Sequence, residues 1–127
     1  MPLEPGAKQR RILIVEDDPH IRRTLIAVFR EEGYNFKEAD DGQEALNILQ
    51  DWKADVIVLD LTMPVMDGWE FLQQQHAREP LSSIPVIVLS AVPNTRRVRE
   101  EPSVKAVMQK PFDLFELIAA VDQACAA

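Results

Sequence analysis

The sequence predicts an α/β fold: a doubly wound, five-stranded parallel sheet with helices on both faces. Three runs of Val, Ile and Leu, at 11–15, 56–60 and 86–89, show no alternation with polar residues. Such runs are typical of strands buried on both faces of a covered sheet. Segments with helical spacing of apolar residues separate them, and each supplies the crossover that a parallel neighbour needs.

The N-terminal stretch 1–10 contains two prolines and a glycine and few core formers, so we expect a flexible arm there. Residues 11–127 are expected to form one domain, because a chain of 127 residues can bury a single proper core. No internal repeat or low-complexity segment divides it.

In the first half of the domain, Asp18 is a good N-cap and Pro19 suits the first turn of a helix. Gly33 marks the end of that helix. The strand at 34–39 alternates only weakly and is less apolar than the other strands, so it is expected at the sheet edge. The helix that follows is expected to end at about Trp52.

In the second half, a helix is expected over about 69–77, before the third buried run. The segment 92–103 is the least regular, because two prolines bracket a charged stretch that has room only for a short helix. A fifth strand is predicted at 104–109 and a last helix over about 113–125.

Composition excludes several classes of function. The net charge of -7 and pI of about 4.8 argue against direct binding of nucleic acid and against anionic membrane surfaces. No apolar run approaches the roughly 20 residues that span a bilayer, and the N-terminus has no apolar signal core. The single cysteine, Cys125, fits a reducing compartment. We therefore expect a cytoplasmic protein without membrane insertion. We also expect a monomer or weak dimer, which composition does not decide.

Four strand ends carry polar residues: Glu16 with Asp17, Asp60, Ser90 and Lys110. In a parallel sheet these ends share one edge, where ligands of open α/β sheets bind. Carboxylates crowded together repel one another unless a cation is present, and Mg²⁺ prefers carboxylate, water and phosphate oxygens. A lysine and a serine suit a phosphoryl group, and aspartate is a covalent acceptor in phosphoryl transfer. The set suits Mg²⁺-assisted phosphorylation of an Asp side chain.

Each of these residues also has an ordinary structural interpretation. The acidic residues at 16–18 could serve only as a charge cluster at a helix N-terminus. Asp60 and Ser90 could be turn residues, and Lys110 a solvated surface lysine. For Asp60 taken alone the two interpretations are about equal, and for each of the other positions taken alone the structural one is the better. All four positions together, each at the end of a predicted strand, favour a site.

The chain resembles the receiver domain of two-component response regulators over about 11–124, nearly its whole length. The motifs that carry the resemblance are ILIVEDD at 12–18, VIVLDLTMPVMDG at 56–68, VIVLSA at 86–91 and KPF at 110–112. Their order and spacing make the match specific. The resemblance implies the flavodoxin-like fold of the chemotaxis regulator, with strand order 2-1-3-4-5.

The resemblance also implies a Mg²⁺ site. Asp17 matches the direct metal ligand and Glu16 matches its acidic neighbour, which acts through water. Asp60 and the main-chain carbonyl of Thr62 match the remaining protein ligands. Asp18, one place beyond the acidic pair, is expected to cap the helix instead.

The same resemblance implies phosphoryl chemistry. Asp60 matches the phosphoacceptor, while Ser90 and Lys110 match the groups that contact the phosphoryl group, and the bond from Lys110 to Pro111 is expected to be cis. The donor would be a histidine kinase or a histidine phosphotransfer protein, and the output a downstream protein target. The chain would not be an enzyme beyond its own phosphorylation and slow dephosphorylation.

Two features depart from the family pattern. Val107 stands where the family usually has an aromatic residue that turns inward, and the stretch from Ser90 to Lys110 is about two residues short. Signal transmission is therefore expected to differ. We hypothesise an order–disorder or loop change in 92–103, which hydrogen exchange with and without a phosphoryl mimic would test.

Three rival functions are weaker. A Mg²⁺-dependent phosphatase needs a second acidic group where Thr62 stands, and an FMN carrier needs a phosphate loop where the acidic run 16–18 stands. A receiver-like binding module that works without phosphorylation stays open because of Val107. Only two residues follow the last predicted helix, so no output domain is expected. A truncated receiver from a larger DNA-binding regulator would have the same sequence.

Overall fold

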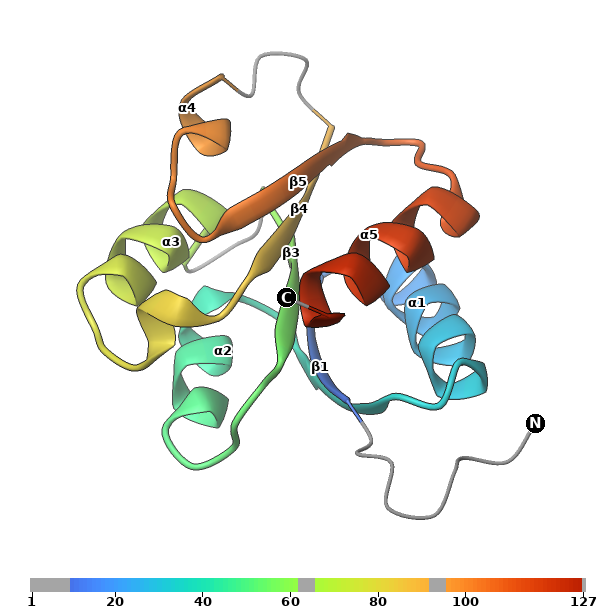
Figure 1. Ribbon diagram of the computed structural model, residues 1–127, viewed down its shortest axis with the longest axis horizontal. Helices are drawn as coiled ribbons and strands as arrows, with labels where there is room; N and C mark the ends of the chain where they lie inside the picture. The colour runs from blue at the N-terminus through green and yellow to red at the C-terminus, as the bar shows by residue number, and fades with distance from the viewer. Residues whose placement is uncertain (1–9, 62–65, 92–95, 127) are drawn as a thin grey trace.

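The computed structural model describes residues 10–61, 66–91 and 96–126, in which strands and helices alternate (Figure 1). The strands are β1 Arg11–Val15, β2 Asn35–Ala39, β3 Val56–Asp60, β4 Val86–Ser90 and β5 Val104–Gln109. The helices are α1 Pro19–Glu31, α2 Gly42–Leu49, α3 Gly68–His76, the 3₁₀ turn η1 Leu81–Ser83, α4 Arg96–Arg99 and α5 Leu114–Ala126. No helix within these ranges is long and apolar enough to cross a bilayer.

The five strands form one parallel sheet in the order β2-β1-β3-β4-β5. This confirms the predicted flavodoxin-like order, with β2 at the edge. Figure 1 shows α2, α3 and α4 on one side of the sheet and α1 and α5 on the other. From β1 the chain goes outward to β2 at one edge, and then crosses to the other side of β1 to form β3. This change of direction places a topological switch point between β1 and β3, at their carboxyl ends.

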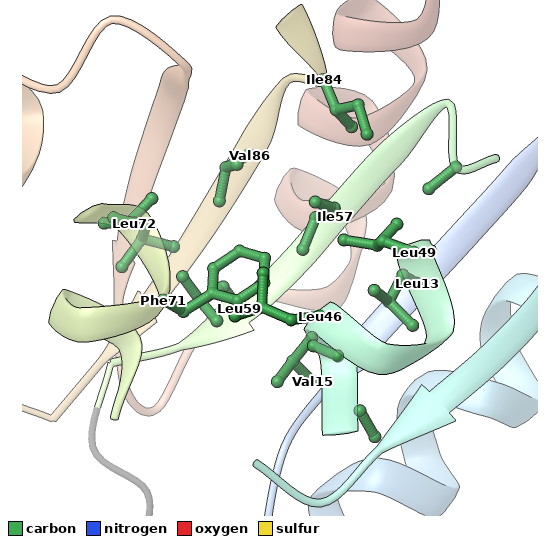
Figure 2. Packing of buried hydrophobic residues seen from close by; sticks show 14 of the residues in the cluster. Leu13, Val15, Leu46, Leu49, Ile57, Leu59, Phe71, Leu72, Ile84 and Val86 are labelled. Atoms are coloured by element: carbon green, nitrogen blue, oxygen red, sulfur yellow. The ribbon is translucent and has the colours of Figure 1, made fainter. Parts of the chain in front are cut away.

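Two hydrophobic cores lie on the two faces of the sheet. Along β3, Ile57 and Leu59 belong to the core under α2 and α3, and Val56 and Val58 belong to the core under α1 and α5. In Figure 2, Phe71 of α3 packs near Leu59 in the first of these cores. Every residue of β3 is buried, because each face of the strand meets a helix layer. The unbroken apolar run in the sequence is the consequence of this double coverage.

Local signals set the helix ends. The Asp18 side chain accepts hydrogen bonds from the amides of His20 and Ile21, so the predicted N-cap of α1 is confirmed. Beyond the other end of α1, Gly33 has φ 91°, a conformation that costs glycine little and other residues more. Asp67 caps α3 in the same way as Asp18 caps α1.

Two predicted boundaries need comment. The helix expected to reach Trp52 ends at Leu49. The amide of Trp52 still bonds to the carbonyl of Ile48 at 3.0 Å, so a last turn continues outside the regular helix. The short helix expected within 92–103 is α4, and the Lys110–Pro111 bond is cis, as predicted. Residues 92–95 of that segment lie outside the described residues.

A register shift separates the first pair of β4 and β5 from the rest. Val86 pairs with Val104, but Ile87 pairs with Ala106, which leaves Lys105 as one extra residue in β5. Because of this bulge, Val104 and Val107 both pack on the α2–α3 face of the sheet, although three positions separate them. Ala106 packs on the opposite face.

Candidate functional site

The carboxyl end of β1 places two acidic side chains at the switch point. The Glu16 amide donates to the carbonyl of Ala39 in β2 at 3.1 Å, so the extended backbone continues one residue past the strand. The Glu16 side chain is 1% exposed, and its Oε2 accepts a hydrogen bond from the Asp18 amide at 3.2 Å. Asp17, between them, is exposed to solvent.

Asp60 is the last residue of β3 and is 3% exposed. Leu61, directly after Asp60, stays close to the sheet because its amide donates to the Leu89 carbonyl in β4 at 3.0 Å. The Gly68 amide in turn donates to the Leu61 carbonyl at 2.9 Å. A Cβ at Gly68 would lie 2.8 Å from the Asp60 carbonyl and 2.7 Å from the Leu61 Cα. Only glycine lets α3 begin this close to the strand end.

Lys110 completes the group from the end of β5. Its Nζ lies 3.1 Å from Glu16 Oε1 and 3.3 Å from Asp60 Oδ1. Its amide donates to the Ser90 carbonyl at 2.8 Å, which fixes the start of the following loop against the end of β4. Ser90 itself is fully buried as the last residue of β4. One edge of the sheet therefore assembles all four predicted strand ends.

The electrostatics of this edge are unfavourable for three ionised carboxylates. Ligand atoms of Glu16, Asp17 and Asp60 all lie within 4.8 Å of one another. Burial, followed by a hydrogen bond and charge repulsion from Asp60, raises the pKa of Glu16 from 4.5 to about 7. Burial also opposes the charge on Lys110, but its hydrogen bond to Glu16 and both carboxylate charges outweigh burial and raise its pKa. One ammonium group balances only part of the negative charge.

The donor set fits a hard divalent cation. Three carboxylates within 4.8 Å would supply oxygen ligands at one point, and Asp17 lies open to solvent, so waters could supply further oxygen ligands. A dication would also relieve the repulsion that raises the pKa of Glu16. The remaining predicted ligand, the carbonyl of Thr62, lies outside the described residues.

Five residues are predicted from their positions at strand ends, and the structure brings these positions to one edge: Glu16, Asp17, Asp60, Ser90 and Lys110. The roles assigned to them stay predictions. The close approach of Gly68 to the end of β3 was not predicted from the sequence. An Asp-Gly pair directly before a helical pattern was the available signal, because an N-cap aspartate is followed by the one residue without a Cβ.

Comparison with known proteins gives one family. The family model described as the response regulator receiver domain matches residues 12–122. Protein Rrf1 of Nitratidesulfovibrio vulgaris is 32% identical over 116 residues, covering 91% of this chain and 83% of that protein. Sporulation initiation phosphotransferase F of Bacillus subtilis is 35% identical over 113 residues, covering 87% of this chain and 90% of that protein. Longer relatives also match, and the chain spans 58% of one mycobacterial transcriptional regulatory protein.

Solved structures agree with this result. The response regulator TrrA of Thermotoga maritima, solved in complex with Mg²⁺ and BeF, superposes with a TM-score of 0.81 at 29% identity, covering 91% of this chain and 99% of that chain. The family match over residues 12–122 includes Glu16, Asp17, Asp60, Ser90 and Lys110. The chain therefore belongs to the response regulator receiver domain family of two-component systems.

Proposed function

We propose that the chain is a phosphoacceptor that takes a phosphoryl group onto Asp60 from a histidine kinase or a histidine phosphotransfer protein, with Mg²⁺ as cofactor. The observation that carries the proposal is the contact of Lys110 with both Glu16 and Asp60, beside three carboxylates within 4.8 Å. A buried nucleophilic carboxylate, an acidic cation site and a lysine are the groups that phosphoryl transfer to aspartate requires.

The step is a displacement at phosphorus. An Oδ atom of Asp60 forms a bond to phosphorus, the bond from phosphorus to the donor imidazole nitrogen breaks, and that nitrogen keeps the electron pair and takes up a proton. Lys110 would then move from carboxylate contacts to a phosphoryl oxygen, and Ser90 would donate its hydroxyl to another. Bound Mg²⁺, held by Asp17, Asp60 and the Thr62 carbonyl with Glu16 through water, would neutralise charge on the phosphoryl oxygens.

The relatives support this assignment. One of them is named a phosphotransferase, and one structural neighbour was solved with Mg²⁺ and BeF. We infer that the present chain shares the cation requirement, because its own donor set suits a hard dication.

The surface beside Lys110 supports a protein as phosphoryl donor. A cleft of about 560 Å³ lies between α1 and the segment that joins β5 to α5, lined by His20, Ile21, Thr24, Lys110, Pro111, Phe112 and Leu114. Phe115, next to this cleft in sequence, is 83% exposed. The apolar residues that line the cleft beside Lys110, together with the exposed Phe115, favour contact with a protein over capture of a small ion.

A second function keeps one specific observation in its favour: signalling through a protein partner without phosphorylation. Val107 lies opposite Val88 and packs on the α2–α3 core, in the place of the family's aromatic residue. A valine has no large ring to turn between an inward and an outward position. In either case the net charge of -7 favours a protein over nucleic acid as the direct output.

Intact mass after treatment with a small phosphodonor tests the first proposal. We expect one added phosphoryl group, about 80 Da, that is lost in Asp60→Asn and in EDTA. An adduct that survives in Asp60→Asn would place the modification elsewhere. No adduct with small donors or with a panel of histidine kinases would favour the phosphorylation-independent module.

The donor surface has a separate test. Phe115→Ala should slow phosphorylation by a phosphohistidine protein and leave phosphorylation by a small phosphodonor unchanged, since Phe115 is exposed and outside both cores. The small donor is the internal control for folding and for the acidic site. Equal rates from the protein donor in both variants would exclude this surface as the docking site.

A further inference from the structure

We propose that Arg22 is a positioning residue for the cation site: it fixes the peptide unit that joins Glu16 to Asp17. The inference rests on the proposed function, because it concerns how the same acidic site is held. Arg22 lies in the second turn of α1 and was not among the residues that the sequence analysis selected.

The guanidinium of Arg22 connects three separate segments. Its Nη1 donates to the Glu16 carbonyl oxygen at 2.7 Å and to Asp40 Oδ1 at 2.7 Å, and its Nε donates to Glu38 Oε1 at 3.1 Å. Its side chain is 18% exposed. A planar guanidinium can make these bonds together because its donors have a fixed geometry.

The contact with Glu16 constrains both acidic side chains. The Glu16 carbonyl belongs to the peptide group whose nitrogen is the Asp17 amide, so one hydrogen bond sets the plane between the two residues. The Glu16 amide is held on the other side by the Ala39 carbonyl at 3.1 Å. The strand end is thus fixed on both sides of Glu16, and the directions of the carboxylates follow from it.

The effect of removing Arg22 on cation binding distinguishes positioning from a purely electrostatic role. Glu38 and Asp40 offset the charge of Arg22, and their side chains are 49% and 65% exposed, outside the buried acidic pocket. If Arg22 acted only as a nearby positive charge, its removal would strengthen the binding of a dication. If it acts by positioning, its removal weakens binding. The two explanations predict changes of opposite sign.

The experiment is a calorimetric Mg²⁺ titration of wild type, Arg22→Met and Arg22→Lys, with urea unfolding in EDTA alongside. Outer-shell partners of metal ligands change metal affinity by about 10- to 100-fold, so we expect Arg22→Met to bind Mg²⁺ on the order of 10-fold more weakly. Arg22→Lys keeps the positive charge but loses the planar guanidinium, so its Mg²⁺ affinity should lie between those of wild type and Arg22→Met. Because it is the milder change, it also provides the result if Arg22→Met does not fold.

Arg30→Met is the matched control. Arg30 also joins α1 to β2, with its guanidinium carbon 5.1 Å from the centre of the Phe36 ring, and it lies near the opposite end of α1 from the acidic residues. It should keep the Mg²⁺ affinity of wild type even if it unfolds at lower urea.

Each outcome decides between the proposals. Weaker Mg²⁺ binding in folded Arg22→Met and Arg22→Lys, with Arg30→Met unchanged, supports positioning. Unchanged or tighter binding in both Arg22 variants overturns it and leaves the proposed function intact. A wild-type protein that binds no Mg²⁺ overturns the proposed function, and the role of Arg22 toward the cation fails with it.

Discussion

Replacing Glu16 with glutamine should make the metal-free protein more stable at pH 8, although Glu16 belongs to the candidate site. In the folded protein the pKa of Glu16 is raised from 4.5 to about 7, chiefly by burial. Folding is therefore unaffected by this group below about pH 4.5, where it is protonated in both states. Between about pH 4.5 and pH 7 the unfolded chain is ionised at this group while the folded protein still holds the proton, so stability falls as the pH rises through this window and stays low above it.

The magnitude follows from the pKa and from the hydrogen bonds. A rise from 4.5 to about 7 corresponds to about 3 kcal/mol of lost stability above pH 7, at about 1.4 kcal/mol for each pKa unit. Glutamine removes this cost, but it has one acceptor oxygen where Glu16 accepts from both Lys110 and Asp18, so about 1 kcal/mol is lost with one hydrogen bond. We expect Glu16→Gln to match wild type near pH 5 and to exceed it by about 2 kcal/mol at pH 8.

Urea unfolding in EDTA at the two pH values measures this difference. The same unfolding at pH 8 with Mg²⁺ should reduce or reverse the advantage of the variant, because a bound cation stabilises the ionised wild-type site. A difference between wild type and Glu16→Gln that stays constant from pH 5 to pH 8 in EDTA would refute the electrostatic account of the pocket.

Three further predictions concern residues other than Glu16. Gly68→Ala should destabilise the protein by about 2 kcal/mol in urea unfolding, because the new Cβ meets the backbone of Leu61, which cannot move aside as a flexible side chain can. Unchanged stability would contradict the close approach of Gly68 to Leu61. Cys125, 8% exposed with a pKa that burial raises, should react with a thiol reagent at pH 8 much more slowly in the native protein than in urea, and equal rates would contradict its burial. Arg97→Ala should shift Trp69 emission, in a background with the other tryptophan replaced by phenylalanine, because the guanidinium carbon lies 4.9 Å from the ring centre; an unchanged spectrum would contradict that contact.

Much of the fold could be predicted because its central strands are buried on both faces. An apolar run such as 56–59 allows few alternatives once helical segments separate it from the next run. The same reasoning predicts which chain segments meet, because parallel strands end at one edge. Glu16 and Lys110 are 94 residues apart in sequence, yet their side chains lie 3.1 Å apart for this reason.

Features that depend on side-chain geometry in three dimensions could not be predicted in this way. Arg22 has the spacing of an ordinary exposed helix residue, and its bonds to Glu38 and Asp40 arise only when β2 lies beside β1. The early end of α2 was also missed, since Ile48 and Trp52 are four residues apart and share a helical face, while the regular helix has already ended. Periodicity describes side-chain direction more reliably than it describes where the backbone leaves a helix.

The extra residue in β5 gives the domain a place where chain length can change without moving Lys110. Downstream of the bulge, Gln109 pairs with Ser90, so Lys110 reaches the sheet edge in a register set by β4. Upstream lies the segment from 96 to 103. Without Lys105, Val104 would still lie opposite Val86 and Ala106 opposite Ile87, each on its present face of the sheet. A change of one residue at this point of β5 can therefore be absorbed by the bulge, while the lysine that contacts both carboxylates keeps its place.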